Sequence, residues 1–301
     1  MAAAERIGFI GLGLMGHGMA KNLVAKGFDV TVLGHRNRKP VDALVARGAK
    51  EGTTPAGLAG GCDIVFLCVT GSQQVEEIVY KTDGLLAGAR KGLIVVDTST
   101  SEPDSTLRIA ADFTKAGAVF VDAPLTRTPK EAEEGRLNVM VGADDASFAR
   151  IEPALKAFAE NIFHVGPTGA GHKLKLVNNF IAMGQAAVIA EATATAAKVG
   201  VDLDALVKVI SAGGVNSGIF QMILPPALKG DLGTFRFALA NAQKDLRYYT
   251  HMTENAGMPS FIGEVVHQSF VQANALGLGD RFVPSLLEAH ERINGVKIVR
   301  R

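Results

Sequence analysis

The chain has 301 residues, of which 48% are hydrophobic and 20% charged, and its formal net charge is +1. This length fits one large or two ordinary domains, and the apolar fraction supports a substantial core, which excludes a disordered chain. Because no block of like charge occurs, the sequence offers no electrostatic footprint for nucleic acid or an anionic membrane. No apolar run is expected to span a bilayer, so we expect neither nucleic acid nor a membrane as a partner.

Cysteine usage and the start of the chain bear on location. The two cysteines, Cys62 and Cys68, lie in or beside one extended apolar segment and are too far apart along it to bridge each other. Buried free thiols are typical of a reducing compartment. The first predicted strand begins at Ile7, which leaves no room for a signal or transit peptide. The expected location is therefore cytoplasmic.

The first predicted elements form a dinucleotide-binding pattern. An apolar run over residues 7–10 is typical of a buried strand, and a helical pattern follows the Gly-x-Gly-x-x-Gly segment. In such a segment Gly11 allows the tight turn, Gly13 leaves room for the pyrophosphate, and Gly16 lets the helix approach the strand. The helix N-terminus then offers free N–H groups to the phosphates. The predicted cofactor-binding residues here are Gly11, Leu12, Gly13, Leu14, Met15 and Gly16.

Strands and helices alternate through the first half of the chain. After the strand over residues 7–10, further strands are predicted over residues 29–33, 64–69, 93–97, 118–122, 137–141 and 162–165. The first predicted helix follows the glycine segment and ends near residue 26. The other predicted helices cover residues 40–47, 73–80, 103–116 and 144–158. Near-continuous apolar strands separated by amphipathic helices imply a parallel sheet covered on both faces.

The second half of the chain is predicted to be all-helical. A Gly/Pro-rich stretch over residues 166–171 precedes an alanine-rich apolar pattern over residues 172–199, a helix on the order of 40 Å long. A helix apolar on most of its circumference is buried on most sides, so we expect a spine shared between domains or subunits. Further helices are predicted over residues 201–211, 237–256, 261–276 and 284–293. The predicted fold class is therefore α/β, with a Rossmann-type doubly wound sheet in residues 1–166 and a helical substrate and oligomerisation domain in residues 167–301.

The end of the second predicted strand bears on the choice of cofactor. An acidic residue there holds the ribose 2′-hydroxyl of NAD, whereas arginine accommodates the 2′-phosphate of NADP. This chain has no carboxylate at that place, and its predicted cofactor residues are His35, Arg36, Asn37 and Arg38. Guanidinium groups suit a dianionic phosphate, so we expect NADP(H), with NAD(H) as the alternative. The competing interpretation is a solvated basic turn that leads into a helix.

Several further motifs make the chain resemble the β-hydroxyacid dehydrogenases, which include 3-hydroxyisobutyrate dehydrogenase and tartronate semialdehyde reductase. The glycine segment is followed by Asp97-Thr98-Ser99-Thr100, by Asp122-Ala123-Pro124-Leu125 with Gly135–Gly142 after it, by Gly169-Ala170-Gly171 with Lys175 and Asn179, and by Lys244-Asp245-Leu246. These blocks occur in the family's order and at its spacings. The resemblance covers essentially the whole chain.

The resemblance implies reversible hydride transfer between a small anionic 3-hydroxyacid and its semialdehyde, of the 3-hydroxyisobutyrate, tartronate or sulfolactaldehyde type. It implies that Lys175 is the general acid or base, which requires its surroundings to lower the pKa of the ammonium. Asn179 lies four residues later, on the same helix face, where its amide can bond the substrate or the lysine. Lys173 and Asn178 fall on other faces. The competing interpretation of Lys175 is an ordinary surface lysine.

The resemblance also assigns cofactor contacts outside the glycine segment. Val69, Thr70 and Gln74 follow the third predicted strand, at positions that line the cofactor in the family, although the family often has Leu-Pro at the first two. Thr100 follows a strand's carboxyl end, where open sheets bind ligands, and corresponds to a position near the nicotinamide. Lys244 corresponds to a residue that contacts cofactor or substrate.

The predicted substrate loop departs from the family pattern Asp-Ala-Pro-Val-Ser-Gly-Gly. Thr126 keeps the hydroxyl of the family serine, but Arg127 replaces a glycine and is followed by Thr128. A guanidinium at this place would suit a strongly anionic head, a sulfonate or a carboxylate. We therefore predict that Thr126, Arg127 and Thr128 bind the substrate together with Lys175 and Asn179. The alternative is that Arg127 faces solvent or pairs with Glu131 or Glu134.

Two other functions remain open from the sequence. One is an imine reductase-like enzyme, which shares the two-domain plan but generally lacks the catalytic lysine. The other is a non-catalytic NADPH-binding sensor. The seven histidines are scattered without the spacing of metal ligands, so no metal site is expected. Family members assemble through the helical domain, and the apolar helix over residues 172–199 agrees with a homodimer or homotetramer.

Overall fold

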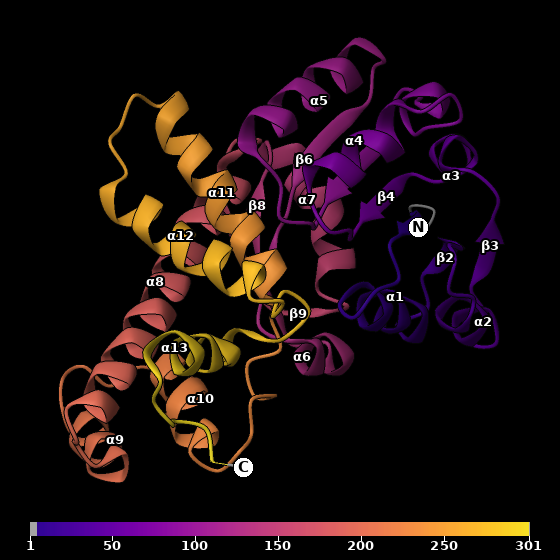
Figure 1. Cartoon of the computed structure of the whole chain (residues 1–301). Helices are drawn as coiled ribbons and strands as arrows, with labels where there is room; N and C mark the ends of the chain where they lie inside the picture. Colours follow the sequence, from indigo (N-terminus) through magenta and orange to yellow (C-terminus); the bar gives the residue numbers. More distant parts are fainter. Residues whose placement is uncertain (1–4, 301) are drawn as a thin grey trace. The chain divides into compact units, whose positions relative to one another are not determined.

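The structure is a computed structural model that describes residues 5–300. The chain divides into two compact units, the first ending at Lys175 and the second beginning at Leu176. The division falls inside helix α8 (Ala170–Lys198), whereas the sequence analysis expects the domain boundary after residue 166 (Figure 1). The sheet belongs to the first unit, and the second unit is helical.

A nine-stranded sheet forms the centre of the first unit within the described residues. Six neighbouring strands run in the order β3-β2-β1-β4-β5-β6, and every pair among them is parallel. Strand β8 then pairs antiparallel with β6 and β7 and parallel with β9. The strands are β1 (Arg6–Ile10), β2 (Asp29–Leu33), β3 (Lys50–Gly52), β4 (Ile64–Leu67), β5 (Ile94–Asp97), β6 (Val119–Asp122), β7 (Leu125–Thr126), β8 (Leu137–Gly142) and β9 (Ala159–Gly166).

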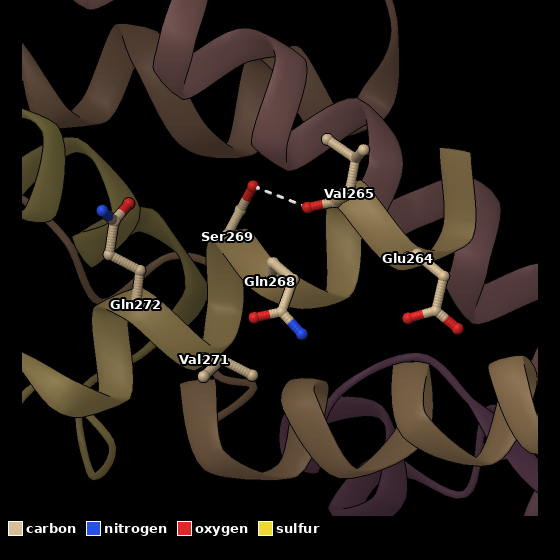
Figure 2. A pocket seen from close by; sticks show the side chains of 6 residues that line it. All are labelled: Glu264, Val265, Gln268, Ser269, Val271 and Gln272. Carbon is tan, nitrogen blue, oxygen red and sulfur yellow. Dashed lines mark hydrogen bonds between the residues drawn. The ribbon is translucent and has the colours of Figure 1, made fainter. Parts of the chain in front are cut away.

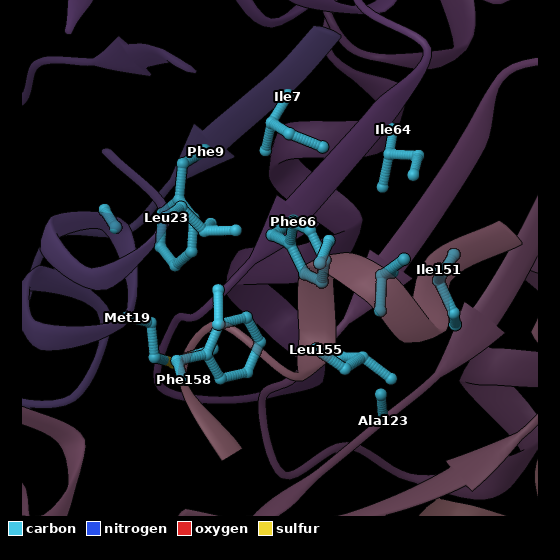
Figure 3. Close-up of a cluster of buried hydrophobic side chains, with 14 of the residues drawn as sticks. Ile7, Phe9, Met19, Leu23, Ile64, Phe66, Ala123, Ile151, Leu155 and Phe158 are labelled. Carbon is cyan, nitrogen blue, oxygen red and sulfur yellow. The ribbon is translucent and has the colours of Figure 1, made fainter. Parts of the chain in front are cut away.

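Apolar side chains on both faces of the sheet explain why helices cover it. The central strands β4 and β5 are buried along their whole length, as expected for a parallel sheet. On one face, Phe66 stacks on Phe9 and meets Phe158 edge-on, with ring centroids 6.0 and 5.7 Å apart (Figure 3). The Rossmann-type fold class predicted from the sequence is confirmed, because the strand order reverses after β1 in a doubly wound arrangement.

The helices of the first unit follow the strands as a crossover fold requires. Their bounds are α1 (Gly16–Ala25), α2 (Lys39–Val45), α3 (Pro55–Gly61), α4 (Ser72–Tyr80), α5 (Pro103–Lys115), α6 (Pro129–Glu134) and α7 (Asp145–Leu155), with a 3₁₀ turn η1 at Leu86–Gly88. Helix α1 packs closely on α6, because a side chain on Gly18 would meet the backbone of Ala132 at 2.6 Å. The helix that follows the glycine turn is therefore in contact with the segment that follows the substrate loop.

Four short elements of the first unit escape the sequence prediction. Strand β3 is a polar Lys-Glu-Gly edge strand, and β7 has two residues, so neither carries a readable alternation. Helix α3 is capped by Thr54 but contains three glycines, which weaken a helical pattern. The polar segment Pro129–Glu134, for which no element was predicted, is helix α6, because Thr128 and Glu131 form a capping box at its start.

The second unit is helical, as predicted, with only an isolated bridge between Ala238 and Phe282 as β structure in its described part. Its core combines small residues of α8, such as Ala186 and Ala190, with Phe220 and Phe270 from other helices. The sequence analysis missed α10, which has two prolines near its end. The remaining elements are α9 (Leu203–Ala212), α10 (Gly218–Ala227), α11 (Leu239–Asn255), α12 (Phe261–Ala275), a 3₁₀ turn η2 (Val283–Ser285) and α13 (Leu286–Asn294).

Helix α8 is less buried than its composition predicts. Only 33% of an apolar stretch of 18 residues in this helix is buried, and Val188 is 66% exposed. By length and composition α8 could cross a membrane, which corrects the expectation that no apolar run reaches that length. One such helix is weak support for a membrane span, because core helices of soluble proteins can have the same length and apolar composition.

Candidate active site

The glycine turn between β1 and α1 has the form that a dinucleotide requires. A Cβ on Gly11 would overlap the carbonyl oxygen of Cys68, and Gly11 has φ +99°. A Cβ on Gly16 would overlap the carbonyl oxygen of Gly11. Gly13, by contrast, has nothing within 4 Å of its Cβ position, and the N-cap residue of α1, Met15, makes no side-chain capping hydrogen bond. These residues fit a dinucleotide, because the open space beside α1 and its N–H groups suit a pyrophosphate.

The loops after β4 and β5 are tied together at the carboxyl edge of the sheet. Ser99 Oγ accepts a hydrogen bond from the Val69 backbone N–H at 3.0 Å. Asp97 in turn accepts from the Ser99 N–H at 2.9 Å and from the Ser101 hydroxyl at 2.8 Å. These bonds fix the loops that carry three of the predicted cofactor residues, Val69, Thr70 and Thr100, and the fourth, Gln74, lies in the first turn of α4. The fully buried Asp97 was not predicted as their organiser.

The basic turn after β2 contains one engaged and one available arginine. Arg38 donates to both oxygens of Glu51, at 2.5 and 3.0 Å, and to Asp42 at 3.1 Å. The hydrogen bond from Arg38 lowers the pKa of Glu51. Exposed His35 and Arg36 make no side-chain hydrogen bond or ion pair among the described residues, and Asn37 accepts from the Lys39 N–H. Arg36 is therefore better placed than Arg38 to meet a phosphate.

The start of α8 is fixed by a buried carboxylate at the end of β6. Asp122 accepts hydrogen bonds from the backbone N–H groups of Gly169 at 2.6 Å and His172 at 2.7 Å. Burial raises the pKa of Asp122, while these N–H groups and the nearby His172 oppose the increase. A Cβ on Gly171 would lie 2.5 Å from the Met140 carbonyl oxygen, so only glycine permits this approach. The carboxylate thus caps the helix that carries Lys175.

His172 links this capped helix to the loop after β5. Its Nδ1 lies 2.7 Å from the Thr106 hydroxyl, and its Nε2 lies 3.2 Å from the Ser99 carbonyl oxygen. Because a carbonyl oxygen only accepts, Nε2 carries a proton in this arrangement. The Asp97 and Asp122 carboxylates each lie 3.8 Å from the ring. The sequence analysis treated His172 as one of several scattered histidines, since its partners come from distant parts of the chain.

Asp122→Asn is expected to destabilise the first unit by about 2–3 kcal/mol, because the amide offers only one oxygen to two buried N–H donors. The other donor would face an NH₂ group. Urea unfolding at neutral pH measures the change, with Asp145→Asn, an exposed residue in the first turn of α7, as the control. A free energy of unfolding unchanged by Asp122→Asn would contradict the capping role.

Lys175 meets the predicted substrate loop within the first unit. Its ammonium donates a hydrogen bond to the Leu125 carbonyl oxygen at 2.6 Å. Lys175 is partly buried. The residue that the sequence analysis assigns to proton transfer and the loop that it assigns to substrate binding are therefore in direct contact.

The three predicted substrate residues of the loop have different surroundings. Thr128 donates to Glu131 at 2.5 Å and caps α6. The Arg127 guanidinium donates to Glu160 on β9 and, at 2.5 Å, to the Arg136 carbonyl oxygen. Its ion-pair partner is therefore Glu160 rather than Glu131 or Glu134, and Arg127 remains exposed to solvent. Thr126 is the only one of the three without a side-chain hydrogen bond in the described part of the chain. Substrate binding by these residues stays a prediction.

A second polar cluster lies in the second unit. Asn179 donates to Asp245 at 2.6 Å, and the Lys244 ammonium lies 2.8 Å from the other oxygen of the same carboxylate. Lys244 also lies 4.7 Å from the ring centroid of Tyr248. Asp245 is 2% exposed and orients both predicted residues, although the sequence analysis did not assign it a role. The sequence feature that could have indicated this role is the position of Asp245 next to Lys244 in the family motif.

An open hollow of about 530 Å³ lies along α12, outside these clusters (Figure 2). None of the predicted site residues lines it. The lining residues are Glu264, Val265, Gln268, Ser269, Val271 and Gln272. Within residues 5–300, no group of three or more His, Cys, Asp or Glu side chains is arranged to hold a metal ion.

Two family models together match most of the chain. Residues 6–166 match the NAD binding domain of 6-phosphogluconate dehydrogenase, and residues 169–288 match the NAD-binding domain of NADP-dependent 3-hydroxyisobutyrate dehydrogenase. The chain is 31% identical to 2-(hydroxymethyl)glutarate dehydrogenase of Eubacterium barkeri, over 99% of both proteins. The chain belongs to the β-hydroxyacid dehydrogenase family. It is accordingly an NAD(P)-dependent oxidoreductase that acts on CH–OH groups.

Other relatives in this family differ in their named substrates. The chain is 31% identical to glyoxylate/succinic semialdehyde reductase 2 of Arabidopsis thaliana, over 94% of the chain and 78% of that protein. The structure of 3-hydroxyisobutyrate dehydrogenase from Salmonella typhimurium superposes with a TM-score of 0.82 at 27% identity, covering 94% of this chain and 99% of that one. An imine reductase from Pseudomonas sp., at 22% identity and a TM-score of 0.61, shares the fold alone.

Proposed function

We propose that this protein transfers a hydride reversibly between a small anionic 3-hydroxyacid and its semialdehyde, with Lys175 as general acid and base. The observation that carries the proposal is the 2.6 Å hydrogen bond from Lys175 to Leu125 in the substrate loop. A carbonyl substrate held by this loop can replace the Leu125 oxygen as the acceptor of that proton. During reduction the ammonium gives a proton to the developing alkoxide, and during oxidation the neutral amine removes it.

The bound dinucleotide would supply or accept the hydride, and the glycine turn would hold its pyrophosphate. The Thr126–Thr128 loop would receive the acid group of the substrate. Asn179 lies one helical turn after Lys175, and its amide is oriented by Asp245. The side-chain conformation of Asn179 is therefore fixed before a substrate oxygen bonds to its amide. Lys244, paired with the same carboxylate, would bind the cofactor or the substrate.

We further propose that NADP(H) is preferred, with NAD(H) as the weaker cofactor. The support is the exposed, uncommitted Arg36 and the absence of an acidic residue in the turn itself. Arg36→Ala is expected to raise the KM for NADPH about tenfold and to leave the KM for NADH unchanged, because only NADPH carries the 2′-phosphate. Arg47→Ala, an exposed arginine after α2, is the control. An equal change for both cofactors would contradict this assignment.

A steady-state assay tests the proposed activity directly. NADPH and NADH would each be offered with succinic semialdehyde, tartronate semialdehyde, glyoxylate, methylmalonate semialdehyde and sulfolactaldehyde. Turnover of at least one aldehyde supports the proposal. Turnover of a cyclic imine instead would favour the imine reductase-like alternative, and NADPH binding without turnover of either class would favour a sensor.

We also propose a cytoplasmic homodimer or homotetramer that has a small anionic substrate and no nucleic-acid or membrane partner. The support for assembly is apolar surface on two helices of the second unit, including Val188 of α8 and Phe261 of α12, which is 79% exposed. Both cysteines are free thiols, which supports a reducing compartment. Light scattering on the purified protein tests assembly, and a monomer at micromolar concentration would contradict it.

A further inference from the structure

We propose that Arg127 is a positioning residue that locks the substrate loop to strand β9 through Glu160, and that the substrate's acid group is bound by the loop itself. This inference rests on the proposed function. In this inference Arg127 does not contact the substrate directly but positions the loop that does. In this arrangement the Thr126 hydroxyl is the loop side chain that remains to receive the acid group.

The backbone of Arg127 has an unusual conformation. Its φ is +81°, and it is the only residue other than glycine with positive φ in the described part of the chain. An L-residue pays in free energy for this left-handed conformation, because Cβ crowds the backbone oxygen. The family pattern has a glycine at this place, and glycine adopts positive φ without penalty. Arg127 therefore needs a compensating interaction to hold the turn.

The Arg127 guanidinium supplies that compensating interaction through two hydrogen bonds. It donates to Glu160 on β9 and to the carbonyl oxygen of Arg136, which directly precedes β8. Strand β7, which carries Thr126, is already paired with β8. The side chain thus ties the loop after β7 to β9 and to the residue before β8, and fixes the loop backbone between Leu125 and the start of α6.

The same contacts argue against a guanidinium that holds the substrate. An anion that binds Arg127 would have to compete with the Glu160 carboxylate and repel it. The neighbouring Thr128 hydroxyl is committed to Glu131 as the cap of α6. The Thr128 N–H also donates to Glu131, at 3.0 Å. Among the three loop residues, Thr126 is the side chain left to meet an anion.

Three variants separate the lock from direct substrate binding. Arg127→Ala loses the ion pair and keeps the unfavourable positive φ. Arg127→Gly also loses the ion pair, but glycine adopts positive φ without a free-energy cost. Glu160→Ala keeps the guanidinium and removes its carboxylate partner. Glu152→Ala, which breaks the ion pair between Glu152 on α7 and Lys156 just after that helix, is the matched control for loss of a glutamate. The readouts are KM and kcat for the best aldehyde of the panel and KM for NADPH.

If Arg127 is a lock, Arg127→Ala and Glu160→Ala raise the aldehyde KM about five- to tenfold, while Arg127→Gly stays within about twofold of wild type. The KM for NADPH is unchanged in all four variants. If Arg127 binds substrate, Arg127→Ala and Arg127→Gly raise the aldehyde KM equally, and Glu160→Ala leaves that KM unchanged or lowers it. Either result overturns the inference. A wild-type protein that turns over no aldehyde refutes the proposed function instead, and circular dichroism identifies any variant that fails to fold.

Discussion

Lys175→Met is expected to lower kcat by about 10²- to 10⁴-fold while the affinity for NADPH stays unchanged, because the variant loses the proton donor and keeps the dinucleotide site. Methionine preserves the length and the apolar stem of the side chain. Stopped-flow measurement of NADPH oxidation with the best aldehyde gives kcat, and fluorescence titration of NADPH gives Kd.

The matched control for this variant is Lys173→Met, which removes a lysine two positions earlier on the same helix. Lys173 is exposed, so kcat should stay within about twofold of wild type. A kcat for Lys175→Met within tenfold of wild type would mean that another group transfers the proton. Lys175 would then be a structural residue that supports the Leu125 carbonyl.

Gly13→Val is expected to raise the Kd for NADPH about 100-fold or more without destabilising the fold. The Cβ position of Gly13 has no neighbour within 4 Å, so the added Cβ meets no protein atom and the side chain would occupy the space proposed for the pyrophosphate. The Tm should therefore change by no more than about 2 °C. Fluorescence titration and differential scanning calorimetry measure the two quantities on the same sample.

Gly61→Val provides the control, because Gly61 is also exposed with nothing within 4 Å of its Cβ position. It lies at the end of α3, away from the glycine turn along the sequence. A folded Gly13→Val protein with wild-type affinity for NADPH would show that the cofactor phosphates lie elsewhere.

The parts of the fold that follow local periodicity could be predicted from the sequence. The apolar strands β1, β4 and β5 and the glycine turn carry their signals within a few consecutive residues. Helix α6 was missed because its signal is one capping box in front of a polar, glutamate-rich segment. Strand β3 was missed because an edge strand need not alternate apolar and polar residues.

Side-chain partners were the harder part of the site to predict. Arg127 pairs with a glutamate 33 positions away, and His172 bonds Thr106 and Ser99 from another helix and loop. These pairs depend on how strands and helices are brought together, which no local pattern encodes. Motif resemblance pointed to Lys175 as a candidate, but it gave no indication that Asp122 caps the N-terminus of the helix that carries Lys175.

The pairing of Arg38 with Glu51 has a consequence for changing the coenzyme by design. Glu51 ends up beside the end of β2, because Glu51 on β3 lies in register with Val32 on β2. A carboxylate of the kind that holds a ribose hydroxyl is thus already present in this region, neutralised by Arg38. Under the proposed preference for NADP(H), coenzyme choice at this edge would depend on which charges cancel one another rather than on which residues are present. A redesign toward the unphosphorylated coenzyme would need to unmask an existing acid, not to introduce a new one.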